Sequence, residues 1–272
     1  MKSNPTIIVT GATRGLGLEF CKYISKLSWN IIMIDIGNKA FSVYRENKSI
    51  DEIKKKLFNK NKLFFYYTDL TNEKNVIQLF KKIKKLNLKI NGLVNFAGGD
   101  ITGNDTKAGG GKPSKNDLLI DKLDYKNVYE RNFFSTFYMN REFVKNYKNQ
   151  NFKRKIVNVS SISGTYGVIN EFAYSSAKSN IIFLTRSLAN YARKFNINVN
   201  CIAPCGTTSA RFLKTIKKRG KKDLSRLKLK GLEGFANPKD ISKVVYFLLS
   251  DLSDFVSGQI IRIDGGENTA PF

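Results

Sequence analysis

A serine, a tyrosine and a lysine in the second half of the chain form a set that can do acid–base chemistry. Tyr174 and Lys178 stand four positions apart in a segment with helical periodicity, so both side chains project from one face. A free tyrosine has a pKa of about 10, and a nearby ammonium lowers that pKa because it favours the phenolate. Ser161 follows a predicted strand, and its hydroxyl can bond a substrate oxygen on which charge develops. We therefore predict Tyr174 as the proton-transfer residue, with its pKa lowered by Lys178.

The missing residue type narrows the chemistry further. The chain contains no histidine, which excludes Ser-His-Asp and Cys-His catalysis and histidine-containing zinc sites. We assign no metal site. Cys21, Cys201 and Cys205 lack the spacing of a metal or redox pair, and we expect all three to be buried apolar side chains. A general acid or base must then be Asp, Glu, Lys, Tyr or Cys.

A second Tyr-x-x-x-Lys pair, Tyr44 and Lys48, tests this reasoning. It lies in a polar segment, and Ile31 stands thirteen positions before Tyr44. Tyr174 has Ser161 at that same offset. The sequence therefore predicts catalysis at Tyr174 and not at Tyr44.

A glycine-rich turn near the amino terminus, from Thr10 to Gly17, predicts a cofactor phosphate site. Glycines permit a tight turn and a close approach of phosphate, and the helix that follows offers free N–H groups and a positive dipole end. Asp35 follows the glycines by roughly 20 residues, where an acid can bond the adenosine ribose and repel a 2′-phosphate. Arg14 favours the opposite choice, because a guanidinium can hold that phosphate. We give Asp35 the greater weight and predict NAD, with NADP as the less favoured cofactor.

The elements that must position these residues alternate along the chain. Apolar runs predict strands over residues 6–10, 31–34, 63–67, 90–95, 156–160, 197–202 and 259–263. Helical spacing falls at 15–27, 53–58, 72–86, 123–147, 172–195 and 238–252. Continuous apolar strands separated by helices imply a parallel sheet covered on both faces. We predict an α/β fold of the Rossmann type, a doubly wound three-layer sheet, as a single domain over residues 1–272.

The net charge of +25 raises nucleic-acid binding as an alternative. Lysines are spread along the whole chain, but they are densest between positions 211 and 230. The basic residues there are Arg211, Lys214, Lys217, Lys218, Arg219, Lys221, Lys222, Arg226, Lys228 and Lys230. Such a segment is either a solvated basic surface or a cationic lid for an anionic substrate, such as a carboxylate, a phosphorylated sugar or a carrier-bound acyl group. Lys112, after three glycines at 109–111, is a candidate second anion contact.

The chain shows no apolar run near the roughly 20 residues that span a bilayer, and no signal-peptide pattern at its start. We expect a cytoplasmic protein that does not enter membranes.

These motifs, in this order, resemble the short-chain dehydrogenase/reductase family across nearly the whole chain. The signatures are the turn Thr10–Gly17, Asp69-Leu70, Asn95-Phe96-Ala97-Gly98, the set of Ser161 with Tyr174 and Lys178, and Pro204-Cys205-Gly206-Thr207. Two positions depart from the family pattern, since Phe96 replaces an asparagine and Cys205 a glycine. The motifs are specific for the family and not for any substrate.

The resemblance implies roles for particular residues. The catalytic residues are Ser161, Tyr174, Lys178 and Asn132, with Asn132 continuing a proton relay through water and Lys178 holding the nicotinamide ribose. The cofactor contacts are Gly11, Thr13, Arg14, Gly15, Leu16, Gly17, Asp35, Asp69, Leu70, Asn95, Ala97, Gly98, Tyr174, Lys178, Pro204, Gly206 and Thr207. The segment 206–236 is expected to close over the substrate. Family members are often tetramers, and a dimer is the other assembly that we expect, with contacts in 172–195 and 255–272.

The resemblance implies an NAD(P)-dependent oxidoreductase that moves hydride between nicotinamide and a ketone or secondary alcohol. The substrate is a small molecule or is bound to a carrier. The alternative is a dinucleotide-binding module without strong activity, whose basic surface binds nucleic acid. The intact Ser161, Tyr174 and Lys178 set favours the enzyme.

Overall fold

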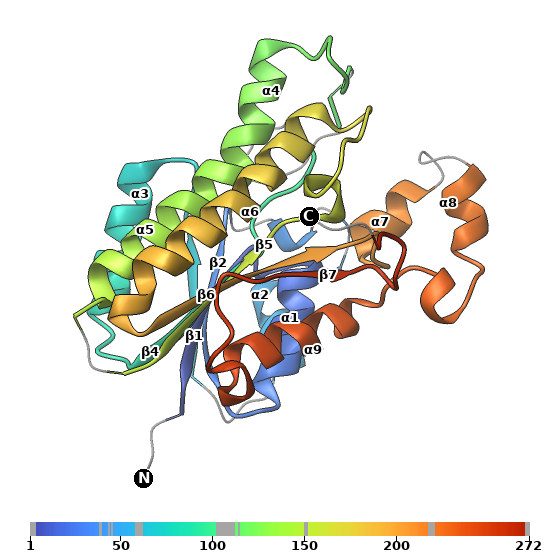
Figure 1. Cartoon of the computed structure of the whole chain (residues 1–272). Coiled ribbons are helices and arrows are strands. Elements are labelled where there is room, and N and C mark those ends of the chain that lie inside the picture. Colours follow the sequence, from blue (N-terminus) through green and yellow to red (C-terminus); the bar gives the residue numbers. More distant parts are fainter. Residues whose placement is uncertain are drawn as a thin grey trace.

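A single parallel sheet runs through the molecule (Figure 1). The computed structural model describes residues 4–37, 40–42, 44, 46–57, 62–101, 112–113, 115–149, 152–216 and 221–269. Its strands are β1 (Thr6–Thr10), β2 (Asn30–Asp35), β3 (Leu63–Tyr67), β4 (Ile90–Asn95), β5 (Arg154–Val159), β6 (Ile197–Pro204) and β7 (Ile260–Ile263). In the described residues their order is β3-β2-β1-β4-β5-β6-β7, and all neighbours are parallel. Every strand overlaps a predicted one.

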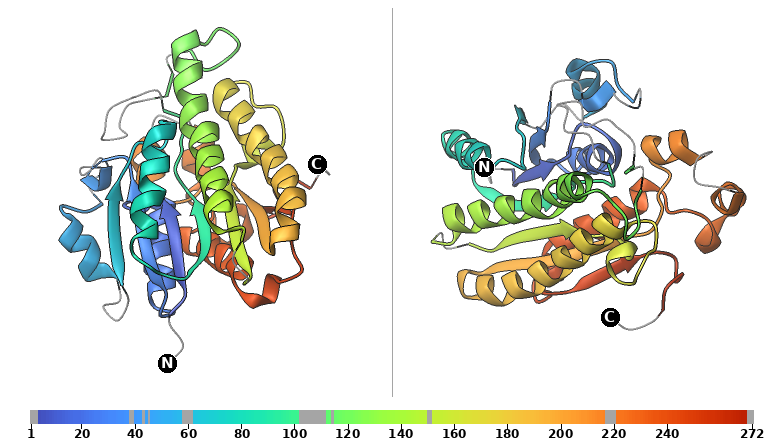
Figure 2. Two further views of the ribbon diagram at one scale, coloured as in Figure 1. Left: turned by 90° about the vertical axis from the view of Figure 1, so that its left-hand side faces the viewer. Right: turned by 90° about the horizontal axis from the view of Figure 1, so that it is seen from above.

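Helices cover both faces of the sheet (Figure 2). One face carries α1 (Gly15–Ser25), α2 (Ile50–Lys56) and α9 (Pro238–Leu249), and the other carries α3 (Glu73–Lys84), α5 (Ser135–Tyr147) and α6 (Phe172–Ala192). Three more helices are α4 (Lys122–Tyr129), α7 (Ala210–Thr215) and α8 (Lys221–Arg226). Short 3-10 turns span Ala40–Ser42, Ile162–Gly164, Arg193–Phe195, Gly231–Glu233 and Asp251–Ser253. The predicted three-layer, doubly wound fold is confirmed.

The core consists of two apolar clusters, one on each face of the sheet. Successive residues of a strand point to opposite faces, so Ile7 and Val9 pack under α1 and α9 while Ile8 packs under α3 and α5. All residues of β1 are buried. This burial on both faces explains why the strands read as continuous apolar runs. No helix of the described residues has the length and apolar character needed to cross a membrane.

The predicted helix over 123–147 is interrupted. A π-helical turn, η2 (Glu130–Phe134), separates α4 from α5. Hydroxyl groups bond the widened backbone, with Ser135 Oγ donating to the Arg131 carbonyl at 2.6 Å and Thr136 Oγ1 to the Asn132 carbonyl at 2.9 Å. Such turns occur frequently at functional sites, and this one carries Asn132.

The strand order places β1 beside β4, and the chain leaves these two strands toward opposite halves of the sheet. A crevice forms at such a switch point, outside the carboxyl ends of the strands. The glycine turn after β1, the segment after β4, Ser161 after β5 and the loop after β6 all lie at this edge. In Figure 1, α7 and α8 lie beside the same edge, apart from the layered body.

Candidate active site

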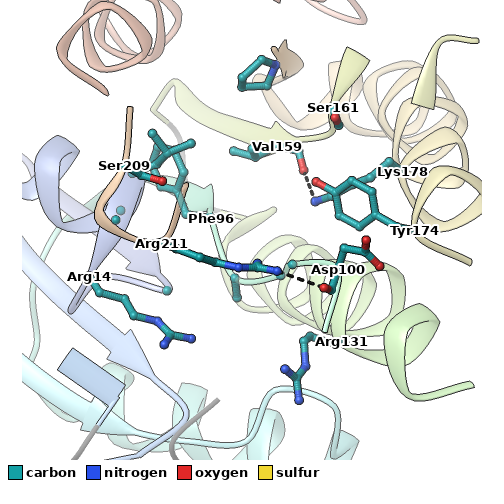
Figure 3. A pocket seen from close by; sticks show the side chains of 18 of the residues that line it. Arg14, Phe96, Asp100, Arg131, Val159, Ser161, Tyr174, Lys178, Ser209 and Arg211 are labelled. Carbon is teal, nitrogen blue, oxygen red and sulfur yellow. Dashed lines mark hydrogen bonds between the residues drawn. The ribbon is translucent and has the colours of Figure 1, made fainter. Parts of the chain in front are cut away.

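One continuous pocket of about 380 Å³ lies along the carboxyl ends of the strands. Asp35, Asp69 and the glycine turn line one end of it. Ser161 and Tyr174 line the other end, where Figure 3 shows them close to Lys178. The pocket therefore joins the predicted cofactor site to the predicted catalytic site, as an elongated dinucleotide with a substrate beyond it requires.

Backbone contacts explain the glycines of the turn. A Cβ atom at Gly17 would lie 2.2 Å from the carbonyl oxygen of Gly11, which no packing allows. Gly11 has φ of +60°, and a Cβ there would lie 2.9 Å from the amide nitrogen of Ala97. That nitrogen donates to Thr10 Oγ1 at 3.0 Å. The glycines thus hold the turn against the segment after β4 and keep the helix end open to a phosphate.

Asp35 lies at the end of β2 and lines the pocket while remaining 6% exposed. Its Oδ2 accepts hydrogen bonds from Thr13 N at 3.0 Å and Thr13 Oγ1 at 2.6 Å, and its Oδ1 accepts from Ile36 N at 2.9 Å. Thr13 does not line the pocket. The Thr13 side chain faces Asp35 and stabilises the turn, and its contact with the cofactor stays a prediction.

A second acid, Glu46, lies at the cofactor end of the pocket. Its two carboxylate oxygens accept from the Gly15 amide at 3.2 and 3.0 Å, at the start of α1. Burial raises the pKa of Glu46, and the nearby charge of Arg14 opposes this. The Arg14 guanidinium lies 5.2 Å from the ring centre of Tyr44, which lines the same pocket. The Tyr44 of the second Tyr-x-x-x-Lys pair thus belongs to the cofactor end.

Ser161, Tyr174 and Lys178 meet at the other end of the pocket (Figure 3). The hydroxyl of Tyr174 is hydrogen-bonded to Ser161. Lys178 is 4% exposed, and its Nζ donates to the carbonyl of Val159 at 2.8 Å and lies 5.5 Å from the ring centre of Tyr174. The helix α6 places the tyrosine and the lysine on one face, as the spacing predicted.

Burial sets the protonation of these two side chains. It raises the pKa of Tyr174, and the charges of Glu171 and Asp100 raise it further, against a smaller opposing effect from the Ser161 bond and Arg211. Burial also lowers the pKa of Lys178 to about 8. The predicted net lowering of the Tyr174 pKa is therefore wrong, because burial and the two carboxylates outweigh the groups that favour the phenolate. The phenol is neutral and suited to donate a proton.

Two predicted asparagines do not line the pocket. Asn132 is buried in η2, where its Nδ2 donates to the carbonyls of Val128 at 2.7 Å and Gly99 at 3.1 Å, and its Oδ1 accepts from Gly99 N at 2.9 Å. Asn95 donates to Oδ1 of both Asn140 and Asn158 at 2.9 Å. The amide of Asn95 joins core elements, and its cofactor contact stays a prediction. Asn132 fixes the backbone at Gly99, and its relay role stays a prediction.

The other predicted cofactor contacts all line the pocket. They are Gly11, Arg14, Gly15, Leu16, Gly17, Asp35, Asp69, Leu70, Ala97, Gly98, Tyr174, Lys178, Pro204, Gly206 and Thr207. Cys21 and Cys201 are buried as expected, but Cys205 is half-buried in the pocket wall. Its thiol donates to the Gly206 carbonyl at 3.3 Å, so the expectation of a fully buried side chain is wrong for Cys205.

A charged network lines the pocket next to Tyr174. Lys112 Nζ contacts Asp100 Oδ2 at 2.9 Å and Glu171 Oε1 at 2.8 Å. Asn116 Nδ2 donates to Asp100 Oδ2 at 3.0 Å, and Ser163 Oγ donates to Glu171 Oε2 at 2.7 Å. Lys112 therefore pairs with two carboxylates, and the anion contact of its loop stays a prediction. The glycines at 109–111 lie outside the described residues.

The basic residues between positions 211 and 230 lie in different environments. Arg211 lines the pocket, and its Nη2 donates to the carbonyl of Asp100 at 2.9 Å (Figure 3). Arg226 pairs with Glu267 at 2.7 Å. Lys214, Lys221, Lys228 and Lys230 are exposed. Lys217, Lys218 and Arg219, like the side chain of Lys222, lie outside what the structure describes. Among the described basic residues of this segment, Arg211 alone lines the pocket.

Four functional side chains escaped the sequence motifs, namely Glu46, Asp100, Glu171 and Arg211 as an individual pocket residue. Asp100 directly follows the Asn95–Gly99 segment, and Glu171 precedes Tyr174 by three positions. An acid so close to a catalytic motif is the one signal that points to them. Glu46 stands in a polar stretch without periodicity, and no sequence signal indicates its contact with Gly15.

Comparison with known proteins identifies relatives of this chain. The profile of the short chain dehydrogenase family matches residues 5–220. The chain is 28% identical over 263 residues to 3-oxoacyl-(acyl-carrier-protein) reductase FabG of Aquifex aeolicus, covering 95% of both proteins. It is 34% identical over 151 residues to 2-dehydro-3-deoxy-D-gluconate 5-dehydrogenase of Escherichia coli, covering 55% of this chain and 58% of that protein.

Among solved structures, 4-hydroxyisoleucine dehydrogenase complexed with NADH superimposes with a TM-score of 0.75 at 26% identity, covering 98% of this chain and 100% of that chain. The family profile covers most of the chain, and it includes the glycine turn and the Tyr174–Lys178 pair. The chain therefore belongs to the short chain dehydrogenase family and is an NAD(P)-dependent oxidoreductase that transfers hydride between nicotinamide and a ketone or alcohol.

Proposed function

We propose that this enzyme reversibly reduces a ketone to a secondary alcohol, with NAD(H) preferred over NADP(H). The observation that carries the proposal is the meeting of Ser161, Tyr174 and Lys178 in a pocket that continues to the glycine turn and Asp35. The nicotinamide, when bound, supplies or accepts the hydride. The relatives named above include reductases and dehydrogenases of carbonyl and alcohol groups.

The proposed roles follow from the protonation of the side chains. Tyr174 is neutral and donates its proton to the carbonyl oxygen during reduction. The Ser161 hydroxyl bonds the same oxygen and stabilises the charge that develops there. Lys178, close to the Tyr174 ring and bonded to Val159, places an ammonium where it stabilises a transient phenolate and holds the nicotinamide ribose. Asn132 positions the Gly99 backbone and continues the predicted relay.

The cofactor end fits a dinucleotide that lacks the 2′-phosphate of NADP. The glycine turn and the amide groups of α1 beyond Gly15 suit the diphosphate, while the Gly15 amide itself is bonded to Glu46. We expect Asp69 at the adenine. Two carboxylates, Asp35 and Glu46, line the region where a 2′-phosphate would bind, and both repel it. Glu46 also offsets the charge of Arg14. These contacts favour NAD, although one solved relative carries NADP and another NADH.

We further propose that residues 206–236 cover the bound substrate as a lid within one domain spanning 1–272. Support comes from the bridge between Thr207 and Ala236, which closes this segment at its base. A homotetramer or homodimer and a cytoplasmic location are also proposed. The outer surfaces of α5 and α6 support the assembly, because Phe183 and Tyr191 are exposed there at 69% and 51%.

The test is oxidation of NADH by the purified protein with a small uncharged diketone, followed at the nicotinamide absorbance. Tyr174→Phe is expected to reduce turnover by at least ~100-fold, the lower range for a positioned acid or base. NADH binding, measured by fluorescence, is expected to persist, because the phenol oxygen is not a phosphate contact. Near-normal turnover of Tyr174→Phe would contradict the role of Tyr174. A wild type that binds no NADH would contradict the function itself.

A further inference from the structure

The pocket wall near Tyr174 is polar and charged, unlike the wall that an apolar chain requires. Asp100, Lys112, Glu171 and Arg211 all line it, together with Ser163. Removing such groups from water without polar partners costs free energy. These groups already pair in part with one another, but a long hydrocarbon chain along the wall would exclude water from their remaining donors and acceptors. The wall therefore favours a substrate with polar atoms of its own.

Arg211 projects from α7 into the pocket, as Figure 3 shows. Its Nη2 donates to the Asp100 carbonyl, and its Nη1 lies so close to Gly99 that a Cβ there would be 2.6 Å away. Its charge acts on the Tyr174 hydroxyl and lowers the pKa of that group. The guanidinium has five N–H donors. In the described part of the chain, Arg211 forms no ion pair with a carboxylate.

The acidic part of the pocket wall consists of the carboxylates of Asp100 and Glu171, which both pair with Lys112. Asp100 is 5% exposed, and its Oδ1 is buried and has no hydrogen-bond partner within the described residues. Its Oδ2 and both oxygens of Glu171 already accept from Lys112, Asn116 and Ser163. Ionised carboxylates accept hydrogen bonds and donate none. This part of the pocket therefore suits ligand hydroxyl groups and repels a ligand carboxylate.

We propose that the substrate is a small polyhydroxylated carboxylic acid, whose carboxylate binds Arg211 and whose hydroxyls face Asp100 and Glu171. The proposal rests on the proposed function, because the reacting ketone must lie at Tyr174 and Ser161. On reduction the C=O π bond breaks, the carbon gains the hydride that NADH loses, and the oxygen gains the proton that Tyr174 loses. The carboxylate and the other hydroxyls are unchanged.

The experiment uses three probes of one carbon count that NADH cannot reduce at a ketone. D-gluconate carries the carboxylate and the hydroxyls, D-glucitol carries the hydroxyls alone, and hexanoate carries the carboxylate alone. Each is titrated calorimetrically into the full-length protein saturated with NADH. Gluconate is expected to bind at least ~10-fold more tightly than either of the others, since glucitol lacks the charge-assisted contact with Arg211 and hexanoate lacks the hydroxyl contacts.

Arg211→Gln is expected to weaken gluconate binding by at least ~10-fold and to leave glucitol binding the same, because only the charged contact is removed. Arg211→Lys, which keeps the charge without the planar fork, is expected to fall between. Lys214→Gln removes a positive charge from the same helix outside the pocket and is expected to bind gluconate as the wild type does. Thermal unfolding checks that each variant is folded.

Any one of the following results would overturn the proposal. They are a wild type that binds gluconate no better than glucitol and hexanoate, an Arg211→Gln variant that retains gluconate affinity, and a loss equally large in Lys214→Gln. A weaker affinity of Arg211→Gln for NADH, with gluconate unaffected, would assign Arg211 to the cofactor diphosphate and also overturn it. Failure of the proposed function is recognised separately, because the diketone assay contains no carboxylate.

Discussion

Tyr174 is half-buried and Lys178 is buried in one wall of the pocket. For a phenol, burial disfavours the anion, and for an ammonium it disfavours the cation. The pKa of Tyr174 therefore rises, while that of Lys178 falls to about 8. A protonated tyrosine is the form that ketone reduction needs at its start. The charge on Lys178 is the one that changes near neutral pH.

The reduction rate should therefore follow the protonation of Lys178. A lysine whose pKa is depressed to about 8 is charged below that pH and neutral above it. Because the ammonium stabilises the phenolate formed on Tyr174, we expect kcat for diketone reduction to be level below pH 7. Above pH 8 it should fall, approaching tenfold per unit. The check is a pH–rate profile at saturating NADH and diketone, with circular dichroism showing that the fold persists. A profile that stays level to pH 10 would assign Lys178 an ordinary pKa and contradict this expectation.

Cofactor choice should depend on Glu46 as well as Asp35. Glu46→Gln removes one of two negative charges near the predicted 2′-phosphate position and releases Arg14 from its influence. We expect the ratio of kcat/KM for NADPH to that for NADH to rise about 10-fold, an electrostatic effect near 1.4 kcal/mol. Asp35→Ala should raise it too. The assays should be run at pH 8, where Glu46 is ionised, because its raised pKa favours the neutral carboxyl at lower pH.

The matched control is Glu52→Gln. Glu52 is an exposed acid nearby in the chain, bonded to Lys56, and it does not line the pocket. Its replacement should leave the cofactor ratio as in wild type. A wild type with a strong preference for NADPH would refute the interpretation of both acids.

At the scale of elements, a chain of buried amides joins the strands that carry the site. Asn95 on β4 and Asn140 on α5 both donate to Asn158 Oδ1 on β5, at 2.9 and 3.0 Å. Asn158 in turn donates to Thr185 Oγ1 on α6 at 3.0 Å. The network fixes α5 and α6 against the sheet directly behind the catalytic residues. Buried networks of this kind are costly to break, because the remaining groups lose their partners.

Asn158→Ala should lower the free energy of unfolding by about 2–4 kcal/mol, since it removes the acceptor of the buried Asn140 amide and one of the two acceptors of the Asn95 amide. Urea denaturation followed by circular dichroism measures the change. Asn180→Ala is the control, because Asn180 lies on the exposed side of α6 and bonds only the Ser176 carbonyl in the described structure. Equal losses in the two variants would show that the network contributes no special stability.

Elements and single contacts differ in how far the sequence predicts them. The strands were predictable because each is a short apolar run buried on both faces. The π-helical turn at 130–134 was not, because its cause is a set of side-chain and backbone bonds within a continuous helical pattern. Thr13 and Asn95 match motif positions, but a motif does not show which way a side chain faces. The contact of Glu46 with Gly15 joins distant positions through an irregular segment, so no periodicity reveals it.

At the scale of the whole molecule, the layer formed by α5 and α6 exposes two aromatic side chains of α6, Phe183 and Tyr191. Figure 2 shows these helices side by side on one face of the sheet. The groove between them combines apolar residues with polar and basic ones, namely Phe137, Val144, Leu184, Leu188, Tyr191, Asn140, Arg141, Lys145 and Lys148. Exposed aromatic side chains beside such a groove are the feature from which we expect an interaction site. The net charge of +25 opposes self-association, so contacts between copies need an apolar contribution.

We expect this surface to join two copies of the chain, so that wild type is a tetramer or dimer at about 10 µM by light scattering. Phe183→Glu places a charge at a side chain that is 69% exposed on α6, and in a dimer related by two-fold symmetry it places that charge in the interface twice. Desolvating it without a partner should dissociate the assembly into smaller species that remain folded. Leu27→Glu is the control, because Leu27 is 41% exposed after α1, on the other face of the sheet. It adds the same charge and should leave the mass unchanged.

Raised salt should favour assembly of wild type by screening the net charge, but it should not rescue Phe183→Glu, whose defect is the buried charge. A monomeric wild type would refute the assembly, and an unchanged mass for Phe183→Glu would move the interface elsewhere, with the Phe255-containing carboxyl-terminal segment as the remaining expected contact.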